Sequence, residues 1–211
     1  MTGPDPEDLT ARARIRDAAL WHFGEHGFDR ATIRGIAETA GVSSGLVRHH
    51  FGSKEALRDA CDAYLVRALE RINDQVRADG ADDGVNYVAV TGAVFGPHQK
   101  YIARALSEGR AAPLFDKLVE LGQQWLAEVD EKRSDRPDLP LKDRAVVGAA
   151  MTLSIAVLHH HVSRGLGVDV LSPGGAEVLA PILLDLYSHP YLSPREAAEF
   201  RSRLGKDGNK D

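Results

Sequence analysis

The sequence predicts an all-α protein with a small three-helix domain at its N-terminus and a larger helical domain after it. Apolar residues recur at helical spacing through most of the chain, and no segment alternates apolar and polar residues as a half-buried strand does. Glycine or proline lies at most of the breaks between these periodic segments. The expected divisions are a disordered arm over 1–9, the three-helix domain over 10–58, the helical domain over 59–204 and a tail over 205–211.

Composition limits the class of protein. Hydrophobic residues make up 43% and charged residues 27% of the 211 residues, which is typical of a soluble globular protein. Cys61 is the single cysteine, so we expect no intramolecular disulfide, no thiolate metal cluster and a cytoplasmic location. The first ten residues lack the apolar core of a secretory signal. The nearly uncharged segment 145–158 is shorter than the ~20 residues that cross a bilayer, so we expect a buried helix and no membrane partner.

The first predicted helix runs over 10–26. Ile15, Ala18, Ala19 and Phe23 form one apolar stripe along it. Gly27 is placed to end it in a left-handed turn. The preceding residues 1–9 contain two prolines and three acids and have little to bury, so we expect them to be disordered.

Two short helices and a long one are predicted next, each with a side chain at its N-terminus that can cap it. Thr32 precedes the first, Ser43 precedes the second over 44–50, and Ser53 precedes the long helix over 54–78. Neither Thr32 nor Ser43 has Glu or Gln three residues later, so single caps are expected rather than reciprocal capping boxes. The three residues Gly41-Val42-Ser43 form the turn between the two short helices.

The second domain is predicted to contain further helices separated by glycine, proline and acidic loops. Residues 134–140 form such a loop, and Pro181 predicts a kink or a late start in the helix that contains it. A short last helix is expected to open at Ser193-Pro194. The other helices are predicted over 85–95, 98–108, 112–132, 142–164 and 176–187.

Residues 32–50 have the pattern of a helix-turn-helix. A recognition helix needs small residues at its N-terminus so that the backbone can approach base edges, and Ser44 and Gly45 meet that need. Arg48 and His49 offer cationic or hydrogen-bonding side chains on its outer face, and we expect Val47 and Phe51 to face the core. The net charge of the chain is −5, but residues 30–58 carry five basic and two acidic residues, which predicts a small cationic face on an acidic protein.

The segment over residues 11–60 resembles the DNA-binding domain of the TetR family of transcriptional regulators. The matching elements are the helix ending in FGEHGF, the pair TIRGIAETAGVS, and the sequence HHFGSKEAL leading into a long helix. The resemblance implies a DNA-binding helix-turn-helix domain followed by an all-helical ligand-binding and dimerisation domain. The rest of the chain resembles the family in architecture alone.

The resemblance also implies roles for individual residues. Thr32 and Lys54 lie where family members bind phosphates, Arg34, Ser44, Gly45 and Arg48 lie where they approach base edges, and His50 lies where they commonly bond the DNA backbone. Ser43 and His49 complete the predicted DNA-binding set. Arg48 replaces a tyrosine that is often present there. An arginine can pair with both acceptors of guanine, worth ~1–3 kcal/mol of discrimination, or bind a phosphate instead.

Three groups of residues are candidates for other sites. His159, His160 and His161 are consecutive on a helix, so their side chains point about 100° apart and do not converge on one metal ion. We therefore expect no metal site and no cofactor. A ligand pocket is predicted from a few polar and aromatic residues, each of which could equally be ordinary core: Phe95, His98, Tyr101, Arg104, Phe115, Trp125 and Met151. A homodimer interface is predicted from the apolar faces of the last long helices: Val146, Val147, Ala150, Leu153, Val157, Leu179, Leu183 and Leu186.

The expected function is that of a sequence-specific DNA-binding regulator, a homodimer on a pseudo-palindromic operator, most simply a repressor released by a small-molecule effector. The alternative is a helical ligand-binding or interaction module without operator binding. An enzyme is not expected, because the sequence contains no nucleophile elbow, phosphate-binding loop or metal-ligand spacing.

Overall fold

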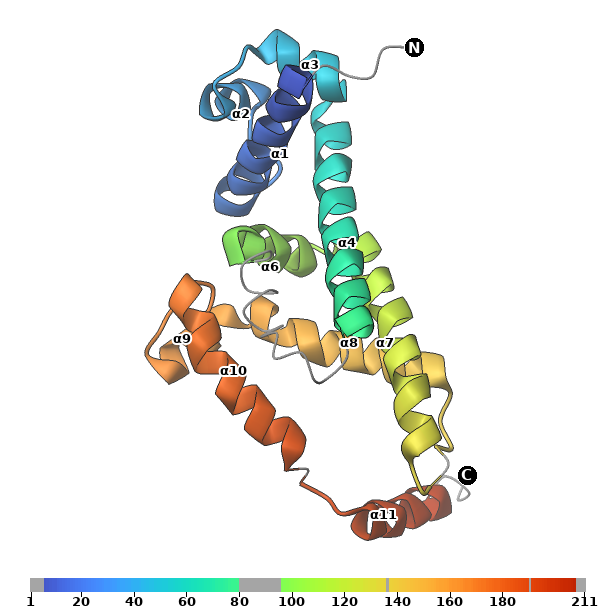
Figure 1. Cartoon of the computed structure of the whole chain (residues 1–211). Coiled ribbons are helices and arrows are strands. Elements are labelled where there is room, and N and C mark those ends of the chain that lie inside the picture. Colours follow the sequence, from blue (N-terminus) through green and yellow to red (C-terminus); the bar gives the residue numbers. More distant parts are fainter. Residues whose placement is uncertain (1–5, 80–95, 136, 190, 208–211) are drawn as a thin grey trace, which may run out of the picture.

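The computed structural model describes residues 6–79, 96–135, 137–189 and 191–207. Within those residues every regular element is a helix, which confirms the all-α prediction. α1, α2 and α3 lie together at one end of the molecule, and α4 extends from them to the remaining helices (Figure 1). In chain order the elements are α1 (Pro6–His26), α2 (Ile33–Ala40), α3 (Ser44–Phe51), α4 (Lys54–Asp79), the 3-10 turn Gly96–His98, α6 (Gln99–Ser107), α7 (Ala112–Lys132), α8 (Leu141–Val157), α9 (His159–Leu166), α10 (Pro173–Ser188) and α11 (Pro194–Asp207).

Single side-chain caps begin the two short helices, as the sequence predicts. The Oγ1 of Thr32 accepts a hydrogen bond from the backbone N–H of Gly35 at 3.0 Å, and the Oγ of Ser43 accepts one from Leu46 at 3.1 Å. Each bond satisfies a donor that the first turn of a helix would otherwise leave unpaired. Gly41 ends α2 at φ +67°, in the left-handed region that favours glycine.

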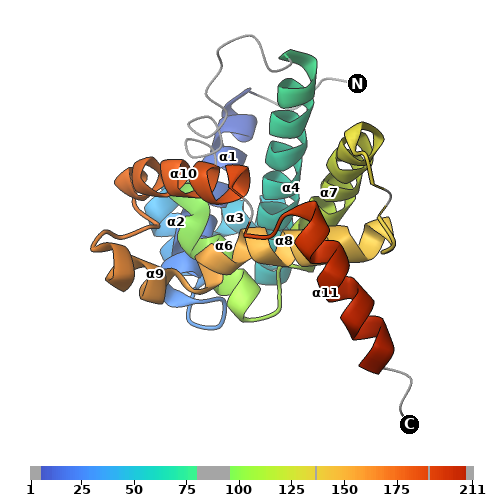
Figure 2. The ribbon, with the colours of Figure 1, turned by 90° about the horizontal axis from the view of Figure 1, so that it is seen from below.

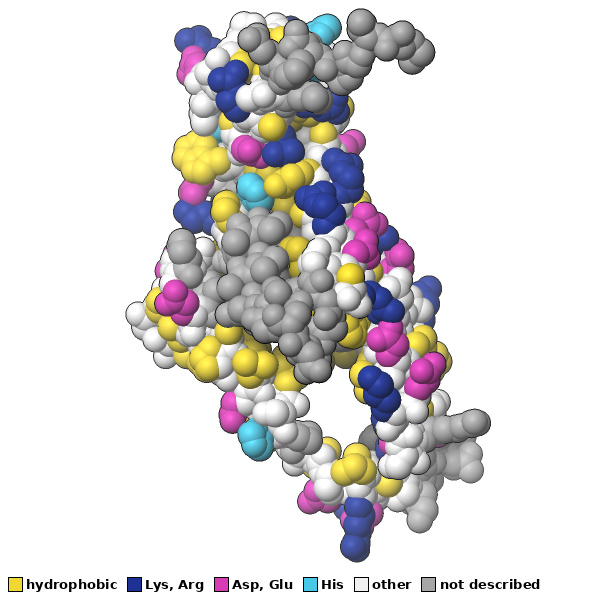
Figure 3. All heavy atoms as spheres, in the orientation of Figure 1, with side chains coloured by type: hydrophobic (Ala, Val, Ile, Leu, Met, Phe, Trp, Pro, Cys, Tyr) yellow, Lys and Arg dark blue, Asp and Glu magenta, His cyan; other side chains and the backbone are white. Residues whose placement is uncertain are grey.

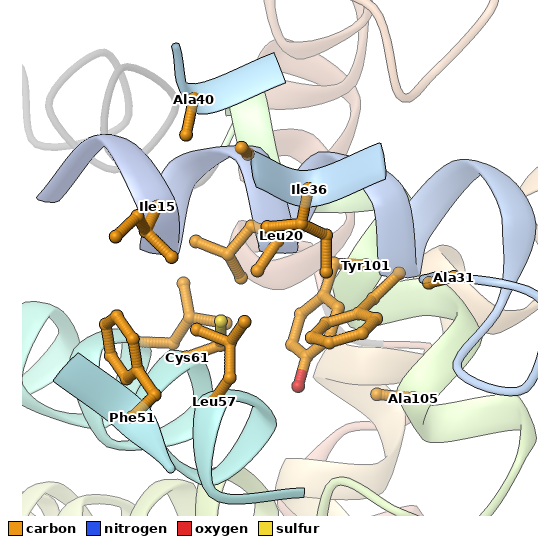
Figure 4. Packing of buried hydrophobic residues seen from close by; sticks show 14 of the residues in the cluster. Ile15, Leu20, Ala31, Ile36, Ala40, Phe51, Leu57, Cys61, Tyr101 and Ala105 are labelled. Carbon is orange, nitrogen blue, oxygen red and sulfur yellow. The ribbon is translucent and has the colours of Figure 1, made fainter. Parts of the chain in front are cut away.

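The main core is formed where α1 packs on α2, α3, α4 and α6. Ile15 and Leu20 of α1 lie between Ile36 of α2 and the α4 residues Leu57 and Cys61 (Figure 4). Tyr101 and Ala105 of α6 belong to the same buried cluster. The core therefore extends across residue 58, where the sequence suggests a domain boundary, and it fixes α6 against α1.

The first helix begins earlier than expected. It starts at Pro6 and not at Thr10, so residues 6–9 of the predicted arm are helical. Proline is well tolerated in a first helical turn because its missing N–H has no partner there in any case. The prediction of a disordered arm is wrong for these four positions, and residues 1–5 lie outside the described part of the chain.

The long helix predicted over 142–164 is broken into α8 and α9, which meet at Leu158 with a bend of 64°. Two hydroxyls in the turn before the break bond to carbonyls of their own helix: Thr152 to Gly148 at 3.0 Å and Ser154 to Met151 at 2.7 Å. Such bonds compete with the backbone ladder and bend helices. The break is not predicted from the sequence, because the apolar composition of this segment suggests one continuous helix.

The bounds of α10 also differ from the prediction. α10 begins at Pro173, before the predicted start at residue 176, because this proline again occupies a first turn. Pro181 lies inside α10, so the suggested late start is wrong. The helix predicted over 85–95 lies outside the described residues.

α10 and α11 lie at the periphery of the molecule, and α11 extends away from the other helices (Figure 2). Hydrophobic side chains gather on the surface over the lower part of the molecule, where α8, α9 and α10 lie (Figure 3). No single described helix is long and apolar enough to span a membrane, and α8 and α9 reach that length and composition only as a bent pair.

Candidate nucleic-acid interface and ligand cavity

α3 has one buried face and one exposed face. Val47 and Phe51 are buried in the main core, as predicted, and hold the helix against α1 and α4. Arg48 and His49 are exposed on the other side. Of the residues that the structure describes, Arg48 forms no ion pair with any, so its guanidinium is available to a ligand. This arrangement has the form that a recognition helix requires.

The N-terminus of α3 leaves room for close approach. Gly45 is exposed, and a Cβ added to it would contact only the Oγ of Ser43, at 3.7 Å. Ser43 itself caps the helix and Ser44 is half-buried. A larger residue at position 45 would therefore be accepted by the fold, so the small size of this residue is not required by packing.

Two predicted contact residues lie on or before α2. The Thr32 hydroxyl accepts its capping bond and retains its own hydrogen for donation to a phosphate. Arg34 is 85% exposed and pairs with Glu38 at 2.9 Å, one turn later on the same helix. Contact with DNA at Arg34 therefore requires the exchange of a solvent-exposed ion pair, which costs about 1 kcal/mol or less.

Lys54 is predicted to contact a phosphate, but its ammonium bonds to backbone carbonyls of the chain. Its ammonium donates to the carbonyl oxygens of Phe28 at 2.9 Å and Ala31 at 3.1 Å, with Asp29 at 3.4 Å. It also lies 4.5 Å from the centre of the Phe28 ring. All three donors of the ammonium are thus directed to the loop between α1 and α2, which makes Lys54 a residue that positions the helix-turn-helix. His50, the remaining member of the predicted set, is half-buried beside the rings of His49 and Phe51.

Two adjoining hollows lie among α4, α6, α7, α8 and α10. The larger has a volume of about 570 Å³ and the smaller about 340 Å³. They share Leu69, Leu118 and Thr152, so they form one elongated cavity along α8. Trp125 and Met151, two of the predicted pocket residues, line the larger hollow. Its size is within the range of small-molecule sites.

Three other predicted pocket residues lie elsewhere, at the contact between α6 and the N-terminal helices. The Tyr101 hydroxyl donates to Asp62 Oδ1 at 2.5 Å, and Arg104 Nε donates to the Gly24 carbonyl at 2.9 Å. His98 packs edge-on against the ring of Tyr64. The sequence cannot separate these residues from the cavity, because a buried aromatic or arginine serves an interface between helices equally well.

Burial changes the titration of this interface. It raises the pKa of the Asp62 carboxyl and of the Tyr101 hydroxyl, and it lowers the pKa of the His98 imidazole. The charged form of each group is disfavoured by loss of water. The contact of α6 with α1 and α4 is held by packing, by the hydrogen bonds of Tyr101 and Arg104, and by an exposed ion pair between Lys100 and Glu25.

Phe115 packs in a second small core with Val119 and Ala145 and does not line either hollow. Phe95 lies outside the described residues. Four polar residues that line the cavity are not predicted from the sequence: Gln99, Asn73, Arg144 and Thr152. Asn73 could have been found, because it replaces an apolar residue in the helical stripe of Leu69, Ile72 and Val76 on α4.

The residues predicted for a dimer interface divide into two groups. Val147, Ala150, Val157 and Leu186 are exposed in the single chain and remain available to a second copy. Val146 packs on the second small core. Leu153, Leu179 and Leu183 line the smaller hollow. The latter four positions thus have a role inside one chain, because α8 and α10 turn one face inward and the other outward.

Comparison with known proteins agrees with the fold and with the helix-turn-helix. The family described as bacterial regulatory proteins of the tetR family matches residues 15–61. The chain is 37% identical over 142 residues to the HTH-type transcriptional regulatory protein RaaS of Mycobacterium tuberculosis, a match that covers 65% of this chain and 66% of that protein. It is 38% identical over 72 residues to the HTH-type transcriptional regulator BetI of Stenotrophomonas maltophilia, covering 34% of this chain and 37% of that protein. The chain thus spans just under two thirds of the first relative and little more than a third of the second.

Solved structures share the arrangement of helices beyond the helix-turn-helix. The fatty acid degradation regulator FadR from Bacillus halodurans aligns with a TM-score of 0.60 at 17% identity, covering 90% of this chain and all of that one. At this identity the likeness concerns the fold alone. The matched N-terminal domain, the relative that extends well beyond it and the shared fold agree, and residues 15–61 form a domain of the TetR family of bacterial regulatory proteins.

Proposed function

We propose that the protein is a sequence-specific DNA-binding transcriptional regulator that acts as a homodimer on a pseudo-palindromic operator. The observation that carries the proposal is the orientation of α3, which buries Val47 and Phe51 and exposes Arg48. The small residue Gly45 lies near the N-terminus of the same helix. In a two-fold dimer, two such helices would enter successive major grooves about 34–36 Å apart. The sense of regulation that we expect is repression relieved by a small molecule.

Apolar side chains on the last helices support dimerisation. Leu184 is 65% exposed on α10, and Val147 and Val157 are exposed on α8. A two-fold interface would bury the copy of each such residue in both chains. It would therefore remove a large apolar surface from water. Four helices, α8 and α10 from each chain, suffice to form such a bundle.

Two elements can transmit ligand binding to DNA. α4 begins beside the helix-turn-helix and lines the cavity near its other end, with Leu69 and Asn73. α6 lines the cavity with Ile102 and bonds to α1 through Arg104. A ligand that favours one placement of these helices would change operator affinity, and a coupling of ~1–3 kcal/mol is enough for a several-fold to hundredfold change.

The test of DNA recognition is selection of binding sites from random-sequence DNA, followed by binding measurements over a range of salt concentrations. We expect a palindromic site for the wild type. Arg48→Ala should relax one base position per half-site, at a cost of about 1–3 kcal/mol. Arg67→Ala, an exposed arginine of α4, is the matched control and should leave the selected sequence unchanged. Weak, sequence-independent binding that disappears at physiological salt would contradict the proposal.

The test of assembly is light scattering after size exclusion. Leu184→Glu should convert the dimer into a monomer, because it would bury an unpaired charge on each side of the interface. Leu139→Glu is the control, since Leu139 is 63% exposed and lies in the loop before α8, on neither α8 nor α10. A wild-type chain that is monomeric at every concentration would overturn the dimer.

A further inference from the structure

We propose that the cavity along α8 takes an elongated, electrically neutral, mainly apolar molecule with a hydrogen-bond donor at one end and an acceptor at the other. This inference rests on the proposed function in taking the cavity as the effector site, and it names the chemical class of the effector. Arg144 and Ala156 mark the two ends of the cavity along α8. At 1.5 Å per helical residue, these positions are about 18 Å apart.

The walls of the cavity favour an apolar ligand. Leucine, isoleucine, valine and alanine side chains from α4, α7, α8 and α10 form most of both hollows. Two of the polar groups among them already have partners. The Oδ1 of Asn73 accepts from the Trp125 indole at 2.9 Å, and the Thr152 hydroxyl donates to the carbonyl of Gly148 at 3.0 Å. The middle of the cavity therefore offers little to a polar ligand.

The charge at one end of the cavity is already neutralised. Arg144 donates from Nη1 to Asp130 Oδ1 at 3.0 Å and from Nη2 to the other oxygen of the same carboxylate. A ligand carboxylate at this end would have to compete with Asp130 for the guanidinium and would lie close to another negative charge. The geometry therefore disfavours an anionic head group, even though an arginine lines the site.

Among the described residues, two buried polar atoms of side chains that line the cavity have no partner, and they define the complementary groups of the ligand. Arg144, which lines the larger hollow, has a buried donor without an acceptor in its Nε. Gln99, which lines the smaller hollow, has a buried acceptor without a donor in its Oε1. Buried polar atoms of native proteins are nearly always paired, so an unpaired donor and an unpaired acceptor at the two ends indicate a ligand with a carbonyl or ether oxygen at one end and a hydroxyl or amide N–H at the other.

A set of matched probes tests each part of this inference on the full chain. The neutral probe is the methyl ester of ω-hydroxydodecanoic acid, which carries a hydroxyl at one end and an ester oxygen at the other. The free acid of the same compound adds a charge, and methyl dodecanoate lacks the hydroxyl. The chain has two tryptophans, so Trp21→Phe leaves Trp125 in the larger hollow as a single fluorescent reporter of binding. Calorimetric titration gives the affinities.

We expect the hydroxy ester to bind and to change the emission of Trp125. The free acid should bind at least about tenfold more weakly because of its charge, and methyl dodecanoate about threefold to tenfold more weakly because it leaves Gln99 unpaired. Gln99→Leu should remove the difference between the hydroxy ester and methyl dodecanoate. Gln124→Leu, an exposed glutamine of α7 outside the cavity, should preserve it.

Three results would overturn the inference: an acid that binds as tightly as its ester, a Gln99→Leu variant that keeps the preference for the hydroxyl, or no binding of any probe. Thr152→Phe, at the junction of the two hollows, should abolish binding of the hydroxy ester, and retained affinity would place the ligand elsewhere. A chain that selects an operator but binds no probe contradicts this inference alone. A chain that binds the hydroxy ester with these preferences but selects no operator contradicts the proposed function alone.

Discussion

The region around α1 and the region around α10 use the same kinds of residue to opposite effect. Ile15, Leu20 and Phe23 of α1 are at most 2% exposed, whereas Leu184 of α10 is 65% exposed. The first region buries its apolar residues within one chain. The second leaves many of them open to solvent or lining a cavity. The difference indicates that the N-terminal part is complete as a single chain, and that the C-terminal part depends on a ligand and a second copy in our proposal.

Matched truncations in the two regions would test this comparison with the largest expected effect. Phe23→Ala should lower the free energy of unfolding by about 3–5 kcal/mol, because it leaves a cavity in a closely packed core. Leu184→Ala removes a side chain that is exposed in the single chain and should change the stability of the monomer by less than about 0.5 kcal/mol. Urea unfolding of the dilute, monomeric protein measures both. Equal losses would show that α10 is packed as tightly as α1.

Lys54→Met tests whether the start of α4 belongs to the internal structure or to the DNA surface. Loss of the bonds to the carbonyls of Phe28 and Ala31 should cost about 1.5–3 kcal/mol of stability. The salt dependence of DNA binding should stay the same, whereas loss of a phosphate contact would reduce its slope by about one. Thermal unfolding and titrations at several salt concentrations separate the two roles. An unchanged stability with a reduced slope would restore the phosphate contact expected from the sequence.

Two glycines sharpen the comparison, because alanine should act on them with opposite sign. A Cβ on Gly24 would lie 2.8 Å from the backbone nitrogen of Tyr101, so Gly24→Ala should separate α1 from α6 and cost about 1–3 kcal/mol. A Cβ on Gly165 of α9 meets nothing within 4 Å, and Gly165→Ala should stabilise the chain by roughly 0.5–1 kcal/mol. Melting temperatures measured side by side give both signs. An unchanged melting temperature in Gly24→Ala would mean that α1 and α6 can move apart without loss of stability.

The smallest expected effect is a dependence of stability on pH at the α6 interface. Burial holds the pKa of His98 below its ordinary value of 6.5, so as the pH falls below about 6.5 the unfolded chain takes up a proton before the folded chain does. The free energy of unfolding should therefore decrease on acidification through this range, by about 1 kcal/mol or less. His98→Gln should flatten the decrease seen in urea unfolding, while replacement of the exposed His160 should not. An identical slope in His98→Gln would assign the effect to other groups.

Much of the N-terminal region could be predicted from the sequence because its signals are local. The caps Thr32 and Ser43, the turn at Gly41 and the inward positions of Val47 and Phe51 depend on residues a few positions apart. The role of Lys54 was out of reach, because its partners lie more than twenty residues earlier in the chain. The family resemblance implied a phosphate contact from the position of Lys54 at the start of the long helix.

Less of the second region could be predicted, because its site is assembled from distant helices. An apolar periodicity does not show whether a leucine faces a core, a cavity or a second subunit. Leu153, Leu179 and Leu183, which the sequence predicts at a dimer interface, line the smaller hollow in the single chain. Tyr101 and Arg104 have the composition of pocket residues but lie at an interface between helices. Gln99 and Arg144, at the two polar ends of the cavity, lie in the first turns of α6 and α8. No pattern among their sequence neighbours indicates that they line a cavity.

The burial of Cys61 gives the protein a built-in reporter of its own opening. It is the single cysteine of the chain, it is fully enclosed beneath α1, and burial raises the pKa of its thiol. A thiol-modifying reagent can reach it only when α1 and α4 separate, so the rate of modification counts those events. Comparing that rate with and without operator DNA would measure how far binding closes the N-terminal domain, at one atom and without any engineered label.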